Sequence, residues 1–347
     1  MATSEHAASA THLAETSHRA RCVSVIVGLA LLLAVAICCS CALGRYGVSL
    51  SDLVNSIIGA DADGTSANVI FHMRAPRVLS AAAIGAMLAT AGCAYQGLFR
   101  NPMVSSDILG ASAGACFGAA LGMLLSFSGI VVQLLAFGFG ILAVTLTYVL
   151  SEKLAKTMDA ILVLVLCGMV VQNLFTAFTS AVKFVADPNS QLPEITFWLM
   201  GGLANVHEDD LVWLLVPLVV GCFGLFALRW KLNIMSCGDE EAASLGVEVK
   251  RTRLLTVCCA TLVTSASVSI AGMVGWVGLI IPHLARFLVG PDNRYLLPTS
   301  FLLGGTFLVL VDDICRSVYT TEIPLSILTS IIGAPLFVYL IYHAKKC

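Results

Sequence analysis

The chain has 347 residues, of which 58% are hydrophobic and only 12% are charged. Together with a mean hydropathy of +0.93, this composition lies outside the usual range of soluble globular proteins. An ordinary water-soluble fold is therefore excluded. The formal net charge of −2 decides little, because the distribution of charge matters more than its sum in a membrane protein.

The first segment of the chain is polar. Residues 1–20 contain too few apolar side chains to pack, which predicts a disordered tail ahead of a membrane domain over residues 21–347. The first apolar run, 22–44, follows Arg19 and Arg21 as a secretory signal would. It is longer than the apolar core of a signal peptide and no A-x-A site closes it, so we expect a retained first helix.

Further apolar runs follow, each long enough to cross a bilayer as a helix. Residues 254–285 lack charge over 32 positions, too many for one span, and Gly272 and Gly275 predict a tight turn that divides them. The chain is thus predicted to be an all-α polytopic membrane protein with ten transmembrane helices. The expected spans are 22–44, 78–99, 108–127, 130–150, 160–182, 211–228, two within 254–285, 295–311 and 323–343.

Lysine and arginine are enriched in cytoplasmic loops, and their distribution predicts the orientation. With the N-terminus inside, fourteen of these residues lie on the inner side and five on the outer side. Both termini are therefore expected in the cytoplasm, together with the 1–20 tail and a loop over about 229–253.

That loop contains the stretch CGDEEAASLGVEVKRTR, residues 237–253, with seven of the forty charged residues. Acidic residues favour a helix N-terminus, and the glycines on either side can end a short helix. A solvated connector is the plain alternative, but a compact acidic, alanine and glycine pattern indicates a rigid knob that fits a partner's groove. The residues concerned are Gly238, Asp239, Glu240, Glu241, Ala242, Ala243, Ser244, Leu245 and Gly246.

Motifs of catalysis and metal binding are missing from the sequence. The thirteen cysteines contain one C-x-x-C pair, Cys38 and Cys41, with no second pair to complete a zinc site, so we interpret them as small hydrophobic residues. We find no H-E-x-x-H and no G-x-S-x-G. The sequence also lacks the G-x-x-x-x-G-K-[ST] loop that cradles ATP phosphates. We expect no metal site, no catalytic residue and no cofactor on this chain.

The stretch GDEEAASLGVEVKRTRLL resembles the coupling loop of the iron-chelate and cobalamin uptake permeases, the ten-helix membrane subunits of type II ABC importers. Three further stretches carry the resemblance, which covers the chain from about Arg21 to Lys346. It implies the type II ABC importer permease fold, with a loop that docks into a separate ATPase subunit holding ATP and Mg. The three stretches are RAPRVLSAAAIGAMLATAGCAYQGLFRNPMVSSDILGASAGA, GWVGLIIPHLARFLVGPDNRYLLP and EIPLSILTSIIGAPLF.

Arg74 and Arg77 flank Pro76 at the expected outer end of the second span. Two cations at a helix N-terminus face the positive end of the helix dipole and need compensation. Snorkelling to lipid head groups is one explanation. The resemblance implies another, in which these arginines and Arg316 dock acidic side chains of an extracytoplasmic substrate-binding protein. For Arg316, a local ion pair with Asp312 or Asp313 is the alternative.

A polar stripe runs along the fifth expected span. Such side chains usually face the protein interior or a water-filled cavity, although hydrogen bonding between packed helices is the alternative. The resemblance implies that this helix lines the substrate path at a dimer axis. The stripe consists of Gln172, Asn173, Thr176, Thr179 and Ser180.

The resemblance implies a permease subunit that moves an iron chelate, siderophore or haem, inward across the bacterial cytoplasmic (inner) membrane. A second permease copy or a close paralogue, two ABC ATPase subunits and the binding protein would complete the importer, with no nucleic acid involved. A cobalamin importer is the alternative. An ion-coupled secondary transporter is a second alternative, disfavoured because no expected span carries an acidic residue near its middle.

Overall fold

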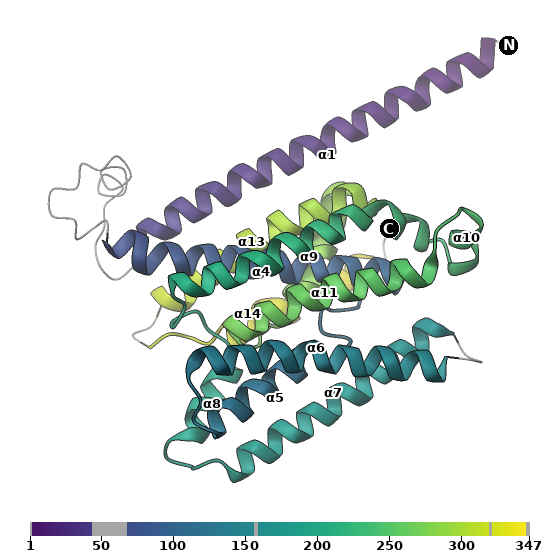
Figure 1. The fold of residues 1–347 in the computed structure, drawn as a ribbon. Helices are drawn as coiled ribbons and strands as arrows, with labels where there is room; N and C mark the ends of the chain where they lie inside the picture. Colours follow the sequence, from purple (N-terminus) through teal and green to yellow (C-terminus); the bar gives the residue numbers. More distant parts are fainter. Residues whose placement is uncertain (1, 44–67, 156–158, 319–320, 345–347) are drawn as a thin grey trace.

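The computed structural model describes residues 2–43, 68–155, 159–318 and 321–344, and the regular structure of these segments is entirely helical. Figure 1 shows long helices that run roughly side by side, with α1 at one edge of the bundle and α7 at the other. The helices are α1 Ala2–Ala42, the short π-helical η1 Val69–Arg74, α4 Ala75–Leu98, α5 Ala111–Leu124, α6 Gly129–Leu154, α7 Ala160–Val185, α8 Gln191–Leu199, α9 Glu208–Met235, α10 Asp239–Ser244, α11 Val249–Ala271, α12 Val277–Val289, α13 Asn293–Ser317 and α14 Leu325–Ala344.

Each apolar run predicted to span the membrane coincides with a helix. Among the described residues, seven helices are long and apolar enough to cross a bilayer, and α5, α12 and α14 are shorter apolar helices. The expected break in the 254–285 run lies where α11 ends at Ala271 and Gly272 adopts a positive φ of 66°. The count of ten crossings stays a prediction, since three of the ten helices are short.

The start of the chain differs from the expectation. Helix α1 begins at Ala2 and therefore includes residues 2–20, which the polar composition predicted to be disordered. This segment is rich in alanine, the residue with the highest helix propensity, so it can extend the apolar helix that follows it. The low apolar content of residues 2–20 indicates few packing partners, but it gives no information on the local preference of alanine for a helix.

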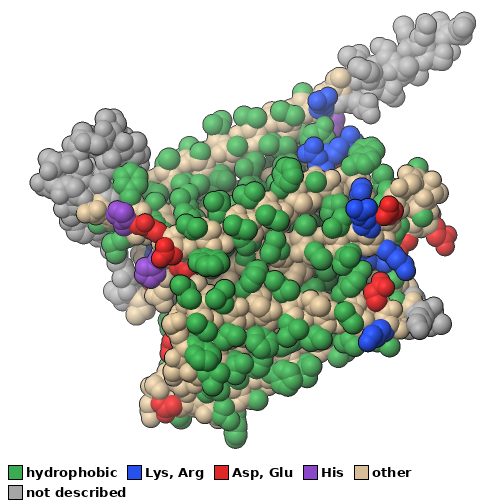
Figure 2. Space-filling model, viewed as in Figure 1, with side chains coloured by type: hydrophobic (Ala, Val, Ile, Leu, Met, Phe, Trp, Pro, Cys, Tyr) green, Lys and Arg blue, Asp and Glu red, His purple; other side chains and the backbone are tan. Residues whose placement is uncertain are grey.

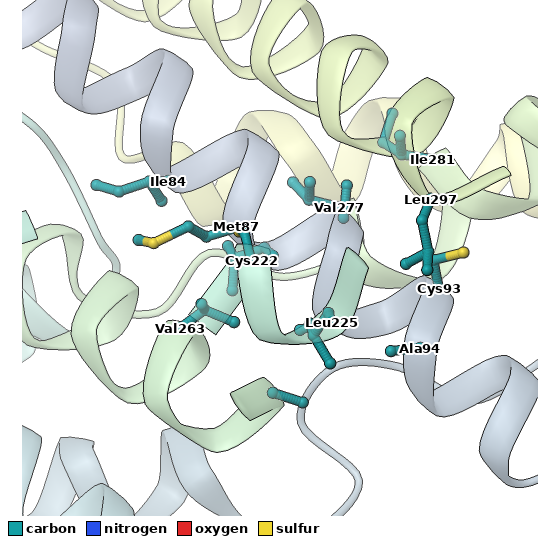
Figure 3. Packing of buried hydrophobic residues seen from close by; sticks show 14 of the residues in the cluster. Ile84, Met87, Cys93, Ala94, Cys222, Leu225, Val263, Val277, Ile281 and Leu297 are labelled. Carbon is teal, nitrogen blue, oxygen red and sulfur yellow. The ribbon is translucent and has the colours of Figure 1, made fainter. Parts of the chain in front are cut away.

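Helix α4 lies at the centre of the larger part of the bundle. In its most apolar window 94% of the residues are buried, and α9, α11, α12 and α13 pack around it. Figure 3 shows Met87 and Cys93 of α4 among side chains from these neighbours, including Cys222, Val277 and Leu297. Small side chains bring the helix axes close together, as is common inside membranes.

Helices α5, α6 and α7 form the other part of the bundle (Figure 1). Glycines of α5 permit close contact with α6, because a Cβ atom added to Gly114 would lie 2.4 Å from the Phe139 carbonyl oxygen. Aromatic rings join the three helices, with half-buried Phe117 of α5 between Phe139 of α6 and buried Phe175 of α7. This second part leaves one side of α7 uncovered.

The bundle has two different ends. The start of α1, α10 and the end of α14 lie at one end, whereas α8, the start of α9 and the end of α13 lie at the other (Figure 1). On the face shown in Figure 2, Lys and Arg side chains gather toward the α10 end, and Asp, Glu and His side chains mark the opposite end. The start of α1 and the end of α14 thus share the end that carries α10.

Candidate functional site

Helix α10 forms a short projection at one end of the bundle. Gly238 precedes it with a φ of 133° and Gly246 follows it with a φ of 83°, values that only glycine adopts readily. The three acidic residues of its first turn, Asp239, Glu240 and Glu241, face the positive end of the helix dipole. The predicted short helix between two glycines is therefore confirmed.

One side of α10 is buried and the other is open. The Ala242 side chain is fully buried in the core cluster, whereas Leu245 is 65% exposed. Glu240, Glu241, Ala243 and Ser244 are exposed as well. An apolar leucine and two carboxylates held in water on a rigid turn form a surface suited to a protein partner.

A half-buried ion pair attaches α10 to the bundle. Arg253, near the start of α11, donates from Nη2 to the Oδ2 atom of Asp239 at 2.5 Å. The Arg253 side chain is only 9% exposed. Sequence reasoning missed this residue because a run of Lys250, Arg251 and Arg253 does not show which of the three turns inward.

Hydrogen bonds also fix the helix that leads into α10. The Asn233 amide in the last turns of α9 donates to Asp292 at 2.5 Å, and the Asn293 backbone N–H donates to the Asn233 oxygen at 2.8 Å. Burial raises the pKa of the Asp292 carboxyl, but hydrogen bonds from Arg294 and Asn233 outweigh it and lower the pKa below its ordinary value. Asp292 therefore stays ionised and caps α13.

At the opposite end, Arg77 forms a buried ionic cluster. Its guanidinium donates to Asp312 from Nε at 2.9 Å and from Nη2 at 2.8 Å, and to Glu322 from Nη1 at 2.7 Å. The exposed fractions are 13% for the Arg77 side chain and 2% for the Asp312 side chain. The cluster links α4 to α13 and to the segment before α14.

The other two predicted docking arginines also face inward. Arg74 is 7% exposed and donates to the carbonyl oxygens of Cys41 and Ala42 at 3.0 and 2.9 Å. Arg316 is 9% exposed, bonds Asp313 and donates to the Ser40 carbonyl oxygen at 2.6 Å.

The structure thus brings Arg74, Arg77 and Arg316 to one end of the bundle, as predicted, but not as an exposed rim. The expected surface position is corrected, because buried guanidinium groups need several acceptors and the ends of α1 and α13 supply them. The alternative for Arg316, a local ion pair with an aspartate of its own helix, is confirmed. The sequence offered one signal for Asp312 and Glu322, because each carboxylate lies at the end of an expected span and could pair with an arginine at the same end of the bundle.

The predicted polar stripe divides between two faces of α7. Asn173, Thr176 and Ser180 are exposed, Gln172 is half-buried and Thr179 is buried. Thr176 and Ser180 each donate to the carbonyl oxygen four residues earlier, at 2.8 and 3.0 Å. Since the helix itself satisfies these hydroxyls, the exposed face can meet water, lipid or another chain.

We expect cysteines at Thr176 and Ser180 to react with a membrane-impermeant thiol reagent in at least one nucleotide state of the assembled protein, because both side chains lie on the uncovered face of α7. The substitutions Thr176→Cys and Ser180→Cys are made in a cysteine-depleted background. Thr179→Cys is the matched control, because it lies on the same helix and is buried. Protection at all three positions in every state would show that the uncovered face does not line an aqueous path.

A cavity of about 940 Å³ opens at the arginine end. The start of α9, the end of α11 and the segment before α14 contribute to its wall, which includes the carboxylates of Glu194, Asp209, Asp210 and Glu322. Asp210 accepts a hydrogen bond from Gln133 at 2.8 Å. Over the described residues, no three His, Cys, Asp or Glu side chains come together in a way that could hold a metal ion.

Comparison with known proteins shows the family of this chain. Residues 32–343 match the model of the FecCD transport family. The chain is 40% identical over 329 residues to the molybdate import system permease MolB of Haemophilus influenzae, covering 93% of this chain and 96% of the relative. It is 41% identical to the cobalamin import system permease BtuC of Halobacterium salinarum, over 80% of this chain and 74% of the relative.

Other relatives and solved structures agree. The Fe(3+)-citrate permease YfmE of Bacillus subtilis is 34% identical over 95% of this chain and 98% of the relative. The inward-facing structure of a protein assigned to the metal-chelate type ABC transporters superposes with a TM-score of 0.85 at 38% identity, covering 92% of this chain and 99% of that chain. PsaBC of Streptococcus pneumoniae shares the fold alone, with a TM-score of 0.59 at 18% identity. On this evidence the chain belongs to the FecCD transport family.

Proposed function

We propose that this chain is the permease subunit of an ATP-driven importer that moves a metal-containing cargo inward across the bacterial cytoplasmic membrane. Support comes from the family match over residues 32–343 and from relatives that are import permeases. The chain itself would perform no covalent chemistry, because ATP and Mg would bind to a partner and no cofactor would bind here.

Helix α10 carries this proposal. It is held at both ends by glycines with positive φ and exposes Glu240, Glu241 and Leu245 beyond the bundle. It lies at the end where Lys and Arg gather (Figure 2), which the positive-inside rule assigns to the cytoplasm. A rigid projection on that side suits docking to an ATPase subunit, with two permease copies engaging two ATPases.

The uncovered side of α7 supports a second permease copy or a close paralogue. Val170, Leu174 and Phe184 are 65%, 46% and 91% exposed, with Asn173 and Thr176 beside them. A face that alternates large apolar and small polar side chains can pack against another chain while part of it borders an aqueous path. Gln172, Asn173, Thr176 and Ser180 are the path residues in this proposal, whereas buried Thr179 packs against the bundle.

An extracytoplasmic binding protein would dock at the opposite end. Arg74, Arg77 and Arg316 are proposed to shape this docking surface from within, because their buried contacts hold α1, α4, α13 and the segment around Glu322 together. Electrostatic complementarity at such a surface governs encounter rate and register. The binding protein itself would contact exposed residues that lie next to these arginines.

The cargo is proposed to be a metal oxyanion or a metal chelate. The sequence favoured an iron chelate, and the Fe(3+)-citrate relative supports this class. The molybdate permease is 40% identical over 93% of this chain and 96% of its own length, so molybdate joins ferric citrate and cobalamin among the cargoes to test. Their radiolabelled uptake into proteoliposomes, measured with the ATPase and binding protein present, distinguishes the three.

Changing α10 is expected to abolish ATP-dependent uptake. The double variant Glu240→Lys with Gly246→Val reverses an exposed charge and removes the positive φ that ends the helix, so the fit to the ATPase is lost. Uptake should fall by at least about tenfold, the scale of typical coupling energies, at unchanged amounts of folded protein. Lys250→Gln, exposed just outside α10, is the matched control. Undiminished uptake by the double variant would reject the coupling role.

A further inference from the structure

Among the described residues, one side-chain ion pair attaches α10 to another helix. Within the part of the chain that the structure describes, the Arg253–Asp239 pair is the only side-chain hydrogen bond or ion pair between α10 and another helix. The other attachment is the buried Ala242 methyl group, a non-directional apolar contact. Backbone hydrogen bonds from the Gly238 N–H to the Met235 carbonyl oxygen at 3.3 Å and from the Val247 N–H to the Ala242 carbonyl oxygen at 3.0 Å join the ends of α10 to the flanking chain.

The ion pair is placed to resist rotation of α10. Asp239 is the first residue of α10, and Arg253 lies near the start of α11. Charge-assisted hydrogen bonds depend on geometry more strongly than apolar contacts do. A push on the exposed side of α10 would therefore reach α11 through the pair.

Helix α11 extends from this pair to the opposite end of the bundle. It has 23 residues and is therefore roughly 35 Å long. At its far end the Ala271 carbonyl oxygen accepts a hydrogen bond from the Gly202 N–H at 2.9 Å, and Ala271 and Gly272 line the cavity there. One rigid helix thus connects α10 with the cavity wall.

The pair is incompletely bonded in this state. The Oδ1 atom of Asp239 and the Nε atom of Arg253 are buried without a hydrogen-bond partner. An arginine and a carboxylate can form two parallel hydrogen bonds, and here one of them is made. Buried polar atoms without partners are rare and call for an explanation. A pair that forms its second hydrogen bond when α10 is pushed would provide that explanation.

We propose that Arg253 and Asp239 are positioning residues that couple movement of α10 to α11 and so to the cavity at the opposite end. This inference rests on the proposed function, since it presumes an ATPase that moves α10. It goes beyond docking, because Arg253, whose side chain is 9% exposed, lies behind the exposed surface of α10.

The test uses the complete complex with its ATPase and a readout that does not depend on the cargo. In a cysteine-depleted background, Asn205→Cys places a thiol in the cavity wall, and its reaction rate with an impermeant reagent is measured without nucleotide and with ATP and vanadate. ATP hydrolysis is measured in parallel to show that the ATPase still binds.

Arg253→Gln should leave ATP hydrolysis within about twofold but reduce the nucleotide-dependent change in reaction rate by about tenfold, in the range of typical coupling free energies. Arg253→Lys, which keeps the charge but loses the planar fork, should have a smaller effect. The exchanged pair Asp239→Arg with Arg253→Asp should recover part of the response. Arg251→Gln is the matched control, since Arg251 is exposed and pairs only with Glu248 at 3.8 Å.

A wild-type response in Arg253→Gln would overturn the proposal. A lost response that the exchanged pair does not recover would also overturn it, because each residue would then have a separate structural role. If the unmodified complex neither hydrolyses ATP nor responds to nucleotide, the proposed function fails, and the coupling role of the pair fails with it. That result is distinguishable from the other two because it concerns the unmodified chain.

Discussion

Arg77→Met is expected to destabilise the folded permease by about 3–5 kcal/mol, the usual effect of removing one partner from a buried ion pair. Asp312, 2% exposed, would be left buried without the guanidinium that now bonds both of its oxygens. The measurement is the thermal unfolding midpoint of the purified protein in detergent, together with its yield in membranes.

The double variant Arg77→Met with Asp312→Leu provides the control. Replacing both partners of a buried pair by apolar residues is often neutral, and Glu322, whose side chain is 35% exposed, can be hydrated. The double variant should therefore recover most of the stability that Arg77→Met loses. Wild-type stability in Arg77→Met would instead mean that the arginine is free to contact a binding protein, as the sequence first suggested.

Gly92→Ala is expected to force α4 and α12 apart. A Cβ atom at this position would lie 1.8 Å from the Gly278 carbonyl oxygen and 2.7 Å from its Cα atom, and a helix backbone cannot yield as a flexible side chain can. Overpacking of this kind costs about 1–3 kcal/mol and sometimes more. A lower unfolding midpoint and reduced transport should both result, because α12 follows α11 after only the short segment 272–276.

Gly138→Ala is the matched control for this prediction. Gly138 lies within α6, and a Cβ atom there would have no neighbour within 4 Å in a single chain. The change should be nearly neutral or slightly stabilising, since alanine favours a helix over glycine by about 1 kcal/mol. Equal effects of the two substitutions would show that the contact between α4 and α12 does not limit stability.

The two ends of the bundle have different physical designs. At the α10 end, charged side chains remain in water and a short helix is held out from the core. At the opposite end, three arginines are withdrawn into ionic and backbone contacts that join helices far apart in the sequence. Such an arrangement suits a permease that receives force at one end and holds a defined surface at the other.

The sequence by itself determined the class of this protein. Long apolar runs must form helices in a membrane, because no water satisfies the backbone there, and the helices follow those runs from α4 to α14. The GDEEAASLG stretch also contains its own structural signals: glycines with positive φ and an acidic first turn define α10 without help from distant residues.

Only the tertiary structure decided which charged side chains face inward. The sequence predicted a docking rim of Arg74, Arg77 and Arg316, because it shows the cations but not the acceptors that folding brings to them. For the same reason, the sequence did not show that Thr179 is buried whereas Thr176 is exposed, or that Arg253 is buried whereas Arg251 is exposed. Local propensity acts over a few residues, whereas the burial of a side chain depends on helices that meet across hundreds of positions of the chain.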